Sequence, residues 1–421
     1  MANAAVEHSG RSDEPTVQIA PVPRISVQAF CESPEIAEVI EKAADDRRLA
    51  KAHVKVHMGG VAAAIEAFRT APTPNLIVLE TFNERSSLIE QLDALAEFCD
   101  AGTKVMVIGH ENDIALYRDL TSRGVSDYVV APLSGLNFIS QLSLLYNGPS
   151  ADALGRVIAV VGAKGGVGAS SVAHNLAWSI SRILNFQTVI ADLDLPFGTA
   201  GLDFNQDPPQ GIADAVFSPD RVDANFVDRL LSKCSDTLSI LSAPATIERL
   251  YDLPEQAFDG VLDILRSTTP CVVLDVPHQW SAWTRRVLLA ADEVVVVAVP
   301  DLANLRNTKV LIDALRAARQ HDHPPRVIIN NVGVPRRPEI SLAEFAKAIE
   351  IEPMTAIPFD PKLFGTAANN GQMLAEVEAS SKLVETLDDV GRALMGKSAT
   401  RRSKKSILGP LLDRLSRKKA S

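Results

Sequence analysis

The sequence predicts an α/β protein built from two doubly wound parallel-sheet domains. Short runs rich in Val, Ile and Leu alternate with helical patterns along most of the 421 residues. In the second half of the chain these runs are almost continuously apolar, as expected for strands with helices on both faces of the sheet. A glycine-rich segment follows the first of those runs, at the kind of turn where open α/β sheets bind ligands.

The smaller domain is predicted over residues 24–146, after residues 1–23, whose composition is that of a disordered tail. Helical segments such as VAAAIEAFRT and SLIEQLDALAEFC separate its strand candidates. These candidates are ISVQAF, HVKVH, NLIVLE, KVMVIGH and DYVVAP. Strands that alternate with helices in this way predict a small, doubly wound parallel sheet.

The larger domain is predicted over residues 156–396. Gly, Pro, Ser and Ala interrupt the periodicity just before it, so residues 147–155 are interpreted as a linker. Its strand candidates are RVIAVVG, TVIADLD, LSILSAP, CVVLDVP, EVVVVAVP and RVIINN. Residues 397–421 follow as a separate basic tail.

Composition narrows the class of protein. The chain is 46% hydrophobic and 22% charged, which is typical of soluble globular proteins. No run approaches the roughly 18 apolar residues of a membrane span, and the first residues lack the apolar block of a secretory signal, so we expect a cytoplasmic protein. The four cysteines are scattered without zinc-ligand spacing and are interpreted as reduced thiols.

Charge is distributed unevenly along the chain. The net charge is −10, although the tail at 397–421 holds nine Lys or Arg residues against one Asp. Because binding to phosphate backbones needs clustered cations, the acidic body argues against specific nucleic-acid binding. The basic tail therefore needs its own explanation.

The segment GAKGGVGASS, residues 162–171, predicts a phosphate-binding loop. Glycines allow backbone N–H groups to approach a phosphate closely, and the helix that follows directs the positive end of its dipole to the same place. Ser170 occupies the position whose hydroxyl reaches Mg²⁺, whereas Ala169 replaces the lysine of the usual P-loop pattern. The candidate nucleotide-binding residues here are Gly162, Lys164, Gly165, Gly166, Val167, Gly168, Ala169, Ser170 and Ser171.

Polar residues end several of the later strands. Asp192 and Asp194 follow TVIA, and Asp275 follows CVVL, where a carboxylate is placed to hold Mg²⁺ through water. Asn330 and Asn331 end RVIINN, and either is placed to contact an adenine edge. Each Asp alone is compatible with a helix cap or a turn, but the set in this order favours a nucleotide site.

These motifs resemble the ParA and MinD group of deviant P-loop ATPases over roughly residues 155–390. The resemblance rests on KGGVGASS, DLDLPFG, LDVP, IINN and IPFDPKLFGTAANNGQML, which occur in the order of that group. It implies ATP and Mg²⁺ as ligands and a nucleotide-sandwich homodimer. In such a dimer Lys164 would reach the partner's phosphates.

The same resemblance implies roles for the strand-end residues. Asp194 would position the attacking water, Ser170 and Asp275 would hold Mg²⁺, and Asn330 with the backbone around Pro358 would flank adenine. Lys164, Asp194 and Asp275 are therefore the candidate catalytic residues. Loss of one electrostatic phosphate contact commonly costs about 100-fold to 1000-fold in rate, so Ala169 predicts weak or absent hydrolysis.

The smaller domain resembles a response-regulator receiver domain that has lost its chemistry. Glu80 stands where the phosphoacceptor aspartate is expected, Ala131-Pro132 replaces Lys-Pro, and Gly109-His110 replaces a hydroxyl residue. Of the expected acidic pair that binds Mg²⁺, only Glu32 is close. Because aspartyl-phosphate chemistry needs all these groups together, we expect no phosphoacceptor and a retained docking or dimerisation surface.

Residues 404–419, KKSILGPLLDRLSRKK, carry one apolar stripe surrounded by Arg and Lys. A short basic amphipathic helix of this kind can lie in a membrane interface. Docking to a protein partner, nucleic-acid contact and a solvated disordered tail remain alternatives.

A receiver-like domain ahead of a ParA/MinD-like domain with Ala in the P-loop resembles the CpaE/TadZ family of Flp (Tad) pilus assembly proteins. The resemblance implies a localisation factor at a cell pole or at the inner membrane, with the pilus secretion ATPase and platform proteins as partners. Its function would depend on nucleotide-dependent dimerisation. The alternatives are a MinD-like division-site or ParA-like partition ATPase with genuine turnover, and a scaffold that binds no nucleotide.

Overall fold

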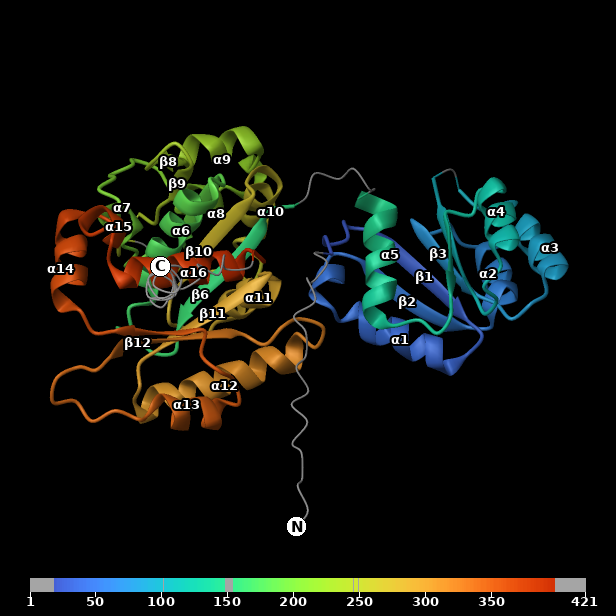
Figure 1. The fold of residues 1–421 in the computed structure, drawn as a ribbon. Coiled ribbons are helices and arrows are strands. Elements are labelled where there is room, and N and C mark those ends of the chain that lie inside the picture. The colour runs from blue at the N-terminus through green and yellow to red at the C-terminus, as the bar shows by residue number, and fades with distance from the viewer. Residues whose placement is uncertain (1–18, 101, 148–153, 245, 249, 398–421) are drawn as a thin grey trace, which may run out of the picture.

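The computed structural model describes residues 19–397, except 101, 148–153, 245 and 249. Two parallel sheets, each covered by helices, form two lobes of the molecule (Figure 1). The predicted basic tail after Lys397 and most of the predicted N-terminal tail lie outside the described residues. No described helix combines the length and apolar character needed to span a membrane.

The first lobe is the receiver-like domain. Its strands are β1 (Ser26–Cys31), β2 (His53–Met58), β3 (Leu76–Glu80), β4 (Lys104–Gly109) and β5 (Asp127–Val130). Its helices are α1 (Pro34–Ala44), the short η1 (Arg47–Leu49), α2 (Gly60–Phe68), α3 (Arg85–Ala96), α4 (Ile114–Ser122) and α5 (Gly135–Asn147). The strands are parallel in the order β2-β1-β3-β4-β5, which confirms the predicted doubly wound sheet.

The second lobe is the ATPase-like domain. Its strands are β6 (Arg156–Gly162), β7 (Thr188–Asp192), β8 (Ser232–Lys233), β9 (Leu238–Leu241), β10 (Cys271–Val276), β11 (Glu293–Ala298), β12 (Arg326–Val332) and β13 (Thr355–Pro358). Its longer helices are α6 (Ala169–Leu184), α10 (Asp259–Thr268), α11 (Ala282–Ala290), α12 (Leu302–Ala318), α13 (Leu342–Ile349), α14 (Pro361–Asn370) and α16 (Lys382–Leu394). Shorter helices are α7 (Ala200–Asp203), α8 (Ile212–Val216), η2 (Pro219–Arg221), α9 (Ala224–Leu230) and α15 (Leu374–Val377).

The second sheet has the order β13-β12-β11-β6-β10-β7-β9-β8. All its pairs are parallel except β8 with β9, and the six strands expected from sequence are all present. The strands that sequence reasoning missed are β8, which has only two residues, and the short edge strand β13. Neither contains an apolar run long enough to predict a strand.

Side chains that alternate along the central strands build a core on each face of this sheet. Ile158 and Val160 of β6 pack with α6 and α16, whereas Ala159 of the same strand packs with α10, α11 and α12 on the other face. Burial on both faces explains why β10 and β11 are buried at every position.

The cysteines behave as the sequence suggested. None of the four forms a disulfide, and Cys31 and Cys271 are buried. Burial raises the pKa of Cys31, Cys234 and Cys271 to about 12, which keeps these thiols protonated and unreactive near neutral pH.

Residues just before the predicted domain boundary belong to the receiver-like core. Val22, expected in the tail, is buried, and its amide donates to the carbonyl of Arg48 over 2.8 Å. The ordered part of this domain therefore begins before Arg24.

An ion-pair cluster joins the two domains at η1. Arg47 bonds Asp322 through Nε at 2.8 Å and Asp292 through Nη2 at 3.2 Å, and Arg48 bonds Asp322 at 2.5 Å. All these side chains are about nine-tenths buried. Burial alone would raise the pKa of Asp322, but Arg47, Arg319 and Arg48 outweigh it and lower that pKa to about 2. The carboxylate is thus charged at neutral pH and paired across the domain contact.

Removing Arg47 tests the contribution of this contact. R47A leaves the Asp292 and Asp322 carboxylates with fewer cations in a buried place, so we expect a loss of about 3 kcal/mol of folding free energy and separate unfolding of the two domains. Calorimetry checks both effects. R69A, at an exposed pair with Glu66, is the control and is expected to change little. Unchanged unfolding of R47A would contradict the prediction.

Candidate nucleotide-binding site

The glycine-rich loop connects β6 to α6, at the carboxyl edge of the sheet. Gly166 and Gly168 have positive φ angles of 78° and 83°, which disfavour side chains. A Cβ on Gly168 would also lie 2.6 Å from the side-chain nitrogen of Asn330. Gly168 precedes α6 and no side chain caps this helix, so its first N–H groups are available to an anion. The loop therefore fits a phosphate group.

Side chains from three other segments hold the loop in this shape. Asn330 donates through Nδ2 to the carbonyl of Val167 at 2.8 Å. Asn307 and His278 donate to the carbonyls of Ala163 and Gly162, each over 2.9 Å. Sequence reasoning missed Asn307 and His278, and the only available signal was that His278 follows the Asp275 strand end.

The charge that the loop can offer comes from Lys164. Its side chain is exposed at the carboxyl edge, while Ala169 begins α6 and packs its methyl group on the core. No other cation occurs in residues 162–171. The loop therefore provides backbone N–H groups and one exposed cation, without a positive charge at position 169.

The predicted acidic residues converge at the same edge. Asp192 and Asp275 are paired in register on β7 and β10, and both are buried. Ser170 lies in the first turn of α6. Asp194 is half-buried in the turn after β7, where its Oδ1 accepts from the amide of Phe197 at 3.2 Å, and burial raises its pKa above the ordinary value. Oxygen donors of this kind suit Mg²⁺.

A buried histidine, His174 of α6, contacts the same carboxylates. Its Nδ1 lies 2.7 Å from Asp203 of α7 and its Nε2 lies 3.4 Å from Asp275. Burial would lower the pKa of His174, but the bonds to Asp203 and Asp275 raise it to about 10. Burial and the charge of Asp275 raise the pKa of Asp192 to about 7. Sequence reasoning missed His174, because it lies outside the apolar positions of α6 that repeat every three or four residues.

The predicted adenine contacts lie together on neighbouring strands. Pro358 of β13 is in register with Val332 of β12, just beyond Asn330. Asn330 is buried, its Nδ2 is used by the loop, and its Oδ1 has no partner among the described residues. The structure thus gives Asn330 a role in supporting the loop, and its contact with adenine stays a prediction.

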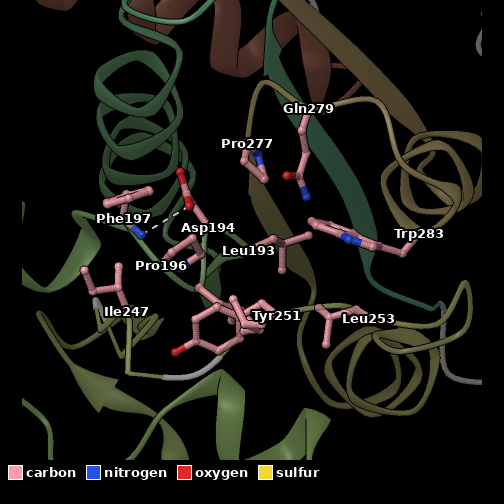
Figure 2. A pocket seen from close by; sticks show the side chains of 12 residues that line it. Leu193, Asp194, Pro196, Phe197, Ile247, Tyr251, Leu253, Pro277, Gln279 and Trp283 are labelled. Carbon is pink, nitrogen blue, oxygen red and sulfur yellow. Dashed lines mark hydrogen bonds between the residues drawn. The ribbon is translucent and has the colours of Figure 1, made fainter.

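An apolar cavity of about 290 Å³ adjoins Asp194. Figure 2 shows side chains from the segments after β7 and β10, together with Tyr251 and Trp283, around this cavity. The loop glycines do not line it, so it is distinct from the phosphate site. Exposed apolar side chains surround the same region, including Phe197, Ile247, Leu250 and Trp280.

In the receiver-like domain, Glu80 is fully buried at the end of β3. One oxygen accepts from the amides of Glu32 and Ser33, each at 2.9 Å, and the other accepts from the Ser33 hydroxyl at 2.6 Å. His110 lies 3.1 Å from the same oxygen as the hydroxyl. Both carboxylate oxygens are therefore hydrogen-bonded where α1 begins, and the absence of a phosphoacceptor stays a prediction.

Comparison with known proteins finds similarity to a pilus assembly protein and to ParA and MinD proteins. No family model matches. A solved structure of the pilus assembly protein CpaE from Caulobacter crescentus is 47% identical over 31% of this chain and 98% of that chain, with a TM-score of 0.30. A ParA family ATPase from Chlorobium tepidum is 25% identical over 57% of this chain and 98% of that chain, with a TM-score of 0.51. Septum site-determining protein MinD from Synechocystis sp. is 24% identical over 58% of this chain and 90% of its own length.

Asn330 provides a test of loop support. N330A leaves the Val167 carbonyl without its donor, so we expect the folding free energy of the chain to fall by about 1–3 kcal/mol. Urea denaturation measures the change. The matched control is N370A at an exposed helix end, which is expected to have little effect. Equal stability of the two variants would argue against a supporting role.

Glu80 provides a second test. E80Q places an NH₂ group among N–H and O–H donors, so we expect the folding free energy to fall by about 1–3 kcal/mol. E84Q, at an exposed position, is the control and is expected to change it little. We also expect no phosphoryl adduct by intact mass spectrometry after incubation of the wild type with acetyl phosphate. An adduct lost in E80Q would show that Glu80 retains phosphoacceptor chemistry.

Proposed function

Because the chain belongs to the CpaE/TadZ family of pilus assembly proteins within the ParA/MinD superfamily, we propose that it is a nucleotide-binding localisation and scaffold factor for Flp (Tad) pilus assembly. In this proposal it binds ATP with Mg²⁺, dimerises and hydrolyses ATP weakly or not at all. One observation carries it: a phosphate loop with an uncapped helix N-terminus keeps its shape although Ala169 replaces the lysine.

The residues present fit Mg²⁺ and ATP. The N–H groups of residues 165–171 would bind the phosphates, and Ser170 with Asp275 would hold Mg²⁺, which supplies positive charge to the phosphate oxygens. Asn330 and the backbone at Pro358 would flank adenine. Asp194, on a turn rather than inside a strand, would orient a water molecule.

Weak turnover follows from the charges around the phosphates. A P-loop lysine stabilises negative charge that develops on the transferred phosphoryl group, and Ala169 removes this stabilisation. Lys164 is exposed and free of short ion pairs among the described residues, so it is available to the phosphates of a partner subunit. Binding would therefore be retained better than hydrolysis.

Dimerisation is supported by the surface beside the site. Phe197 is 71% exposed and Leu250 is 95% exposed, and both lie in loops near Asp194. Trp280 and Leu302 are also exposed, just after β10 and at the start of α12. Exposed apolar groups gathered beside a binding site are typical of protein interfaces. We propose a second copy of the chain as their partner.

The remaining roles follow from family membership. We propose that the pilus secretion ATPase and platform proteins are partners, and that the receiver-like domain is a docking surface. Residues 404–419 would give peripheral contact with the inner membrane and polar placement. Genuine turnover, as in a division-site or partition ATPase, is the second candidate, since Lys164, Asp194 and Asp275 are retained.

Reinstating the lysine tests the proposal. We expect the wild type to bind Mg-ATP with micromolar affinity and to release almost no phosphate, and A169K to raise hydrolysis by about 10-fold or more. Calorimetry and phosphate release on the same sample measure the two properties. A314K is the matched control, because it adds a lysine at an exposed position in the second half of α12, away from both the loop and Leu302.

The outcomes separate the candidates. Robust turnover by the wild type would favour the division-site or partition ATPase. Absence of nucleotide binding would leave a scaffold that binds no nucleotide. Equal hydrolysis by A169K and A314K would show that position 169 does not limit the rate.

A further inference from the structure

The carboxylates behind the proposed Mg²⁺ site share one buried polar partner. His174 has no exposed surface and lies among Asp192, Asp203 and Asp275. Atoms of His174, Asp192 and Asp275 that can bind a ligand all lie within 4.8 Å of one another. Among the described residues, no Lys or Arg forms an ion pair with any of these carboxylates. The imidazole is therefore the cationic or donor group on which this cluster depends.

The contacts of His174 connect elements that are far apart in sequence. Nδ1 reaches Asp203 at the end of α7 over 2.7 Å, and Nε2 reaches Asp275 on β10 over 3.4 Å. Nε2 is buried and has no hydrogen-bond partner among the described residues, and Asp275, the carboxylate proposed to hold Mg²⁺, lies within ion-pair distance of it. Because α6 begins at the phosphate loop, His174 also fixes the positions of Asp203 and Asp275 relative to that loop.

The segment between β7 and α7 is anchored to the same cluster. Asp192 accepts from the amide of Ala200 at 3.0 Å and from the amide of Asp194 at 3.1 Å. The amide of Leu193 donates to the carbonyl of Asp275 at 3.0 Å. The turn that contains Asp194 thus lies between Asp192 and α7. His174 contacts α7 through Asp203.

We propose that His174 is a positioning residue that couples the Asp275 carboxylate to α7, and through α7 to the turn that carries Asp194. This inference rests on the proposed function, because it assigns Asp275 to Mg²⁺. Loss of a group that contacts a metal-binding carboxylate without binding the metal itself commonly lowers metal affinity by about 10-fold to 100-fold. His174 would therefore set both the Mg²⁺ requirement for nucleotide binding and the order of the turn.

Two substitutions separate the two ring nitrogens. In H174N the side-chain amide nitrogen replaces Nδ1, which keeps a donor for Asp203 and removes the contact with Asp275. In H174Q the amide nitrogen replaces Nε2, which keeps a donor for Asp275 and removes the contact with Asp203. S181A is the matched control, because Ser181 is a buried polar residue of the same helix that bonds Thr237 and touches none of these carboxylates.

The first readout is the Mg²⁺ dependence of binding of a fluorescent ATP analogue. We expect the Mg²⁺ concentration for half-maximal binding to rise by about 10-fold or more in H174N and to stay near the wild-type value in S181A. Binding measured in EDTA should be equal in all three proteins. A merely structural role would lower the melting temperature without moving this Mg²⁺ dependence.

The second readout needs no nucleotide. The amides of Asp203 and Phe204 donate within α7, so hydrogen exchange there reports the order of this helix. We expect exchange to accelerate by about 10-fold in H174Q and to change little in H174N, since loss of one bond to a charged group is worth roughly that factor. D203A removes the acceptor of this bond without altering His174 and is expected to match H174Q, which keeps the test available if H174Q fails to fold.

The results distinguish this inference from the proposed function. If the wild type binds no Mg-ATP, the proposed function fails, and exchange at α7 still decides the link between His174 and Asp203. If binding occurs but H174N and S181A need the same Mg²⁺ concentration, the coupling to Asp275 is overturned. Stoichiometric Co²⁺ binding by the nucleotide-free protein that is lost in H174N would also overturn it, by making His174 a metal ligand.

Discussion

Buried negative charge at the carboxyl ends of β7 and β10 is the constraint on which the ATPase-like domain depends. Parallel strands bring Asp192 and Asp275 side by side, and burial of two such carboxylates is costly without a cation or several donors. His174, the backbone amides after β7 and the proposed Mg²⁺ each reduce that cost. The phosphate loop, the turn of Asp194 and α7 are therefore parts of one electrostatic arrangement.

Each domain keeps a fold while lacking a lysine that its chemistry would need. In the receiver-like domain Glu80 is longer than aspartate, and its oxygens reach back to the amides at the start of α1. Glu80 thus supports the start of α1. In the ATPase-like domain Ala169 packs on the core, and the loop is held by the carbonyl contacts of Asn330, Asn307 and His278. Both sites are therefore held by hydrogen bonds that need no ligand.

The contact between the domains leaves the carboxyl edge of the sheet, with the loop at residues 162–171, open. Arg47 bonds Asp292, which directly precedes β11 and whose amide donates to Val157 near the start of β6. This is the amino edge of the sheet, opposite the loop at residues 162–171. The receiver-like domain can therefore be held firmly by buried ion pairs while the carboxyl edge, with its exposed apolar side chains, remains accessible to a second copy.

The sequence by itself determined the two sheets, the phosphate loop, the acidic strand ends and the missing lysine. These are local features: apolar runs mark strands, and glycines or polar residues at their ends mark the site. Only the tertiary structure decided that His174 faces Asp203 and Asp275, that Asn330 supports the loop, and that Arg47 joins the domains. Helical periodicity did not mark His174 as buried, and which carboxylates meet it depends on the packing of α7 and β10, which lie far along the chain.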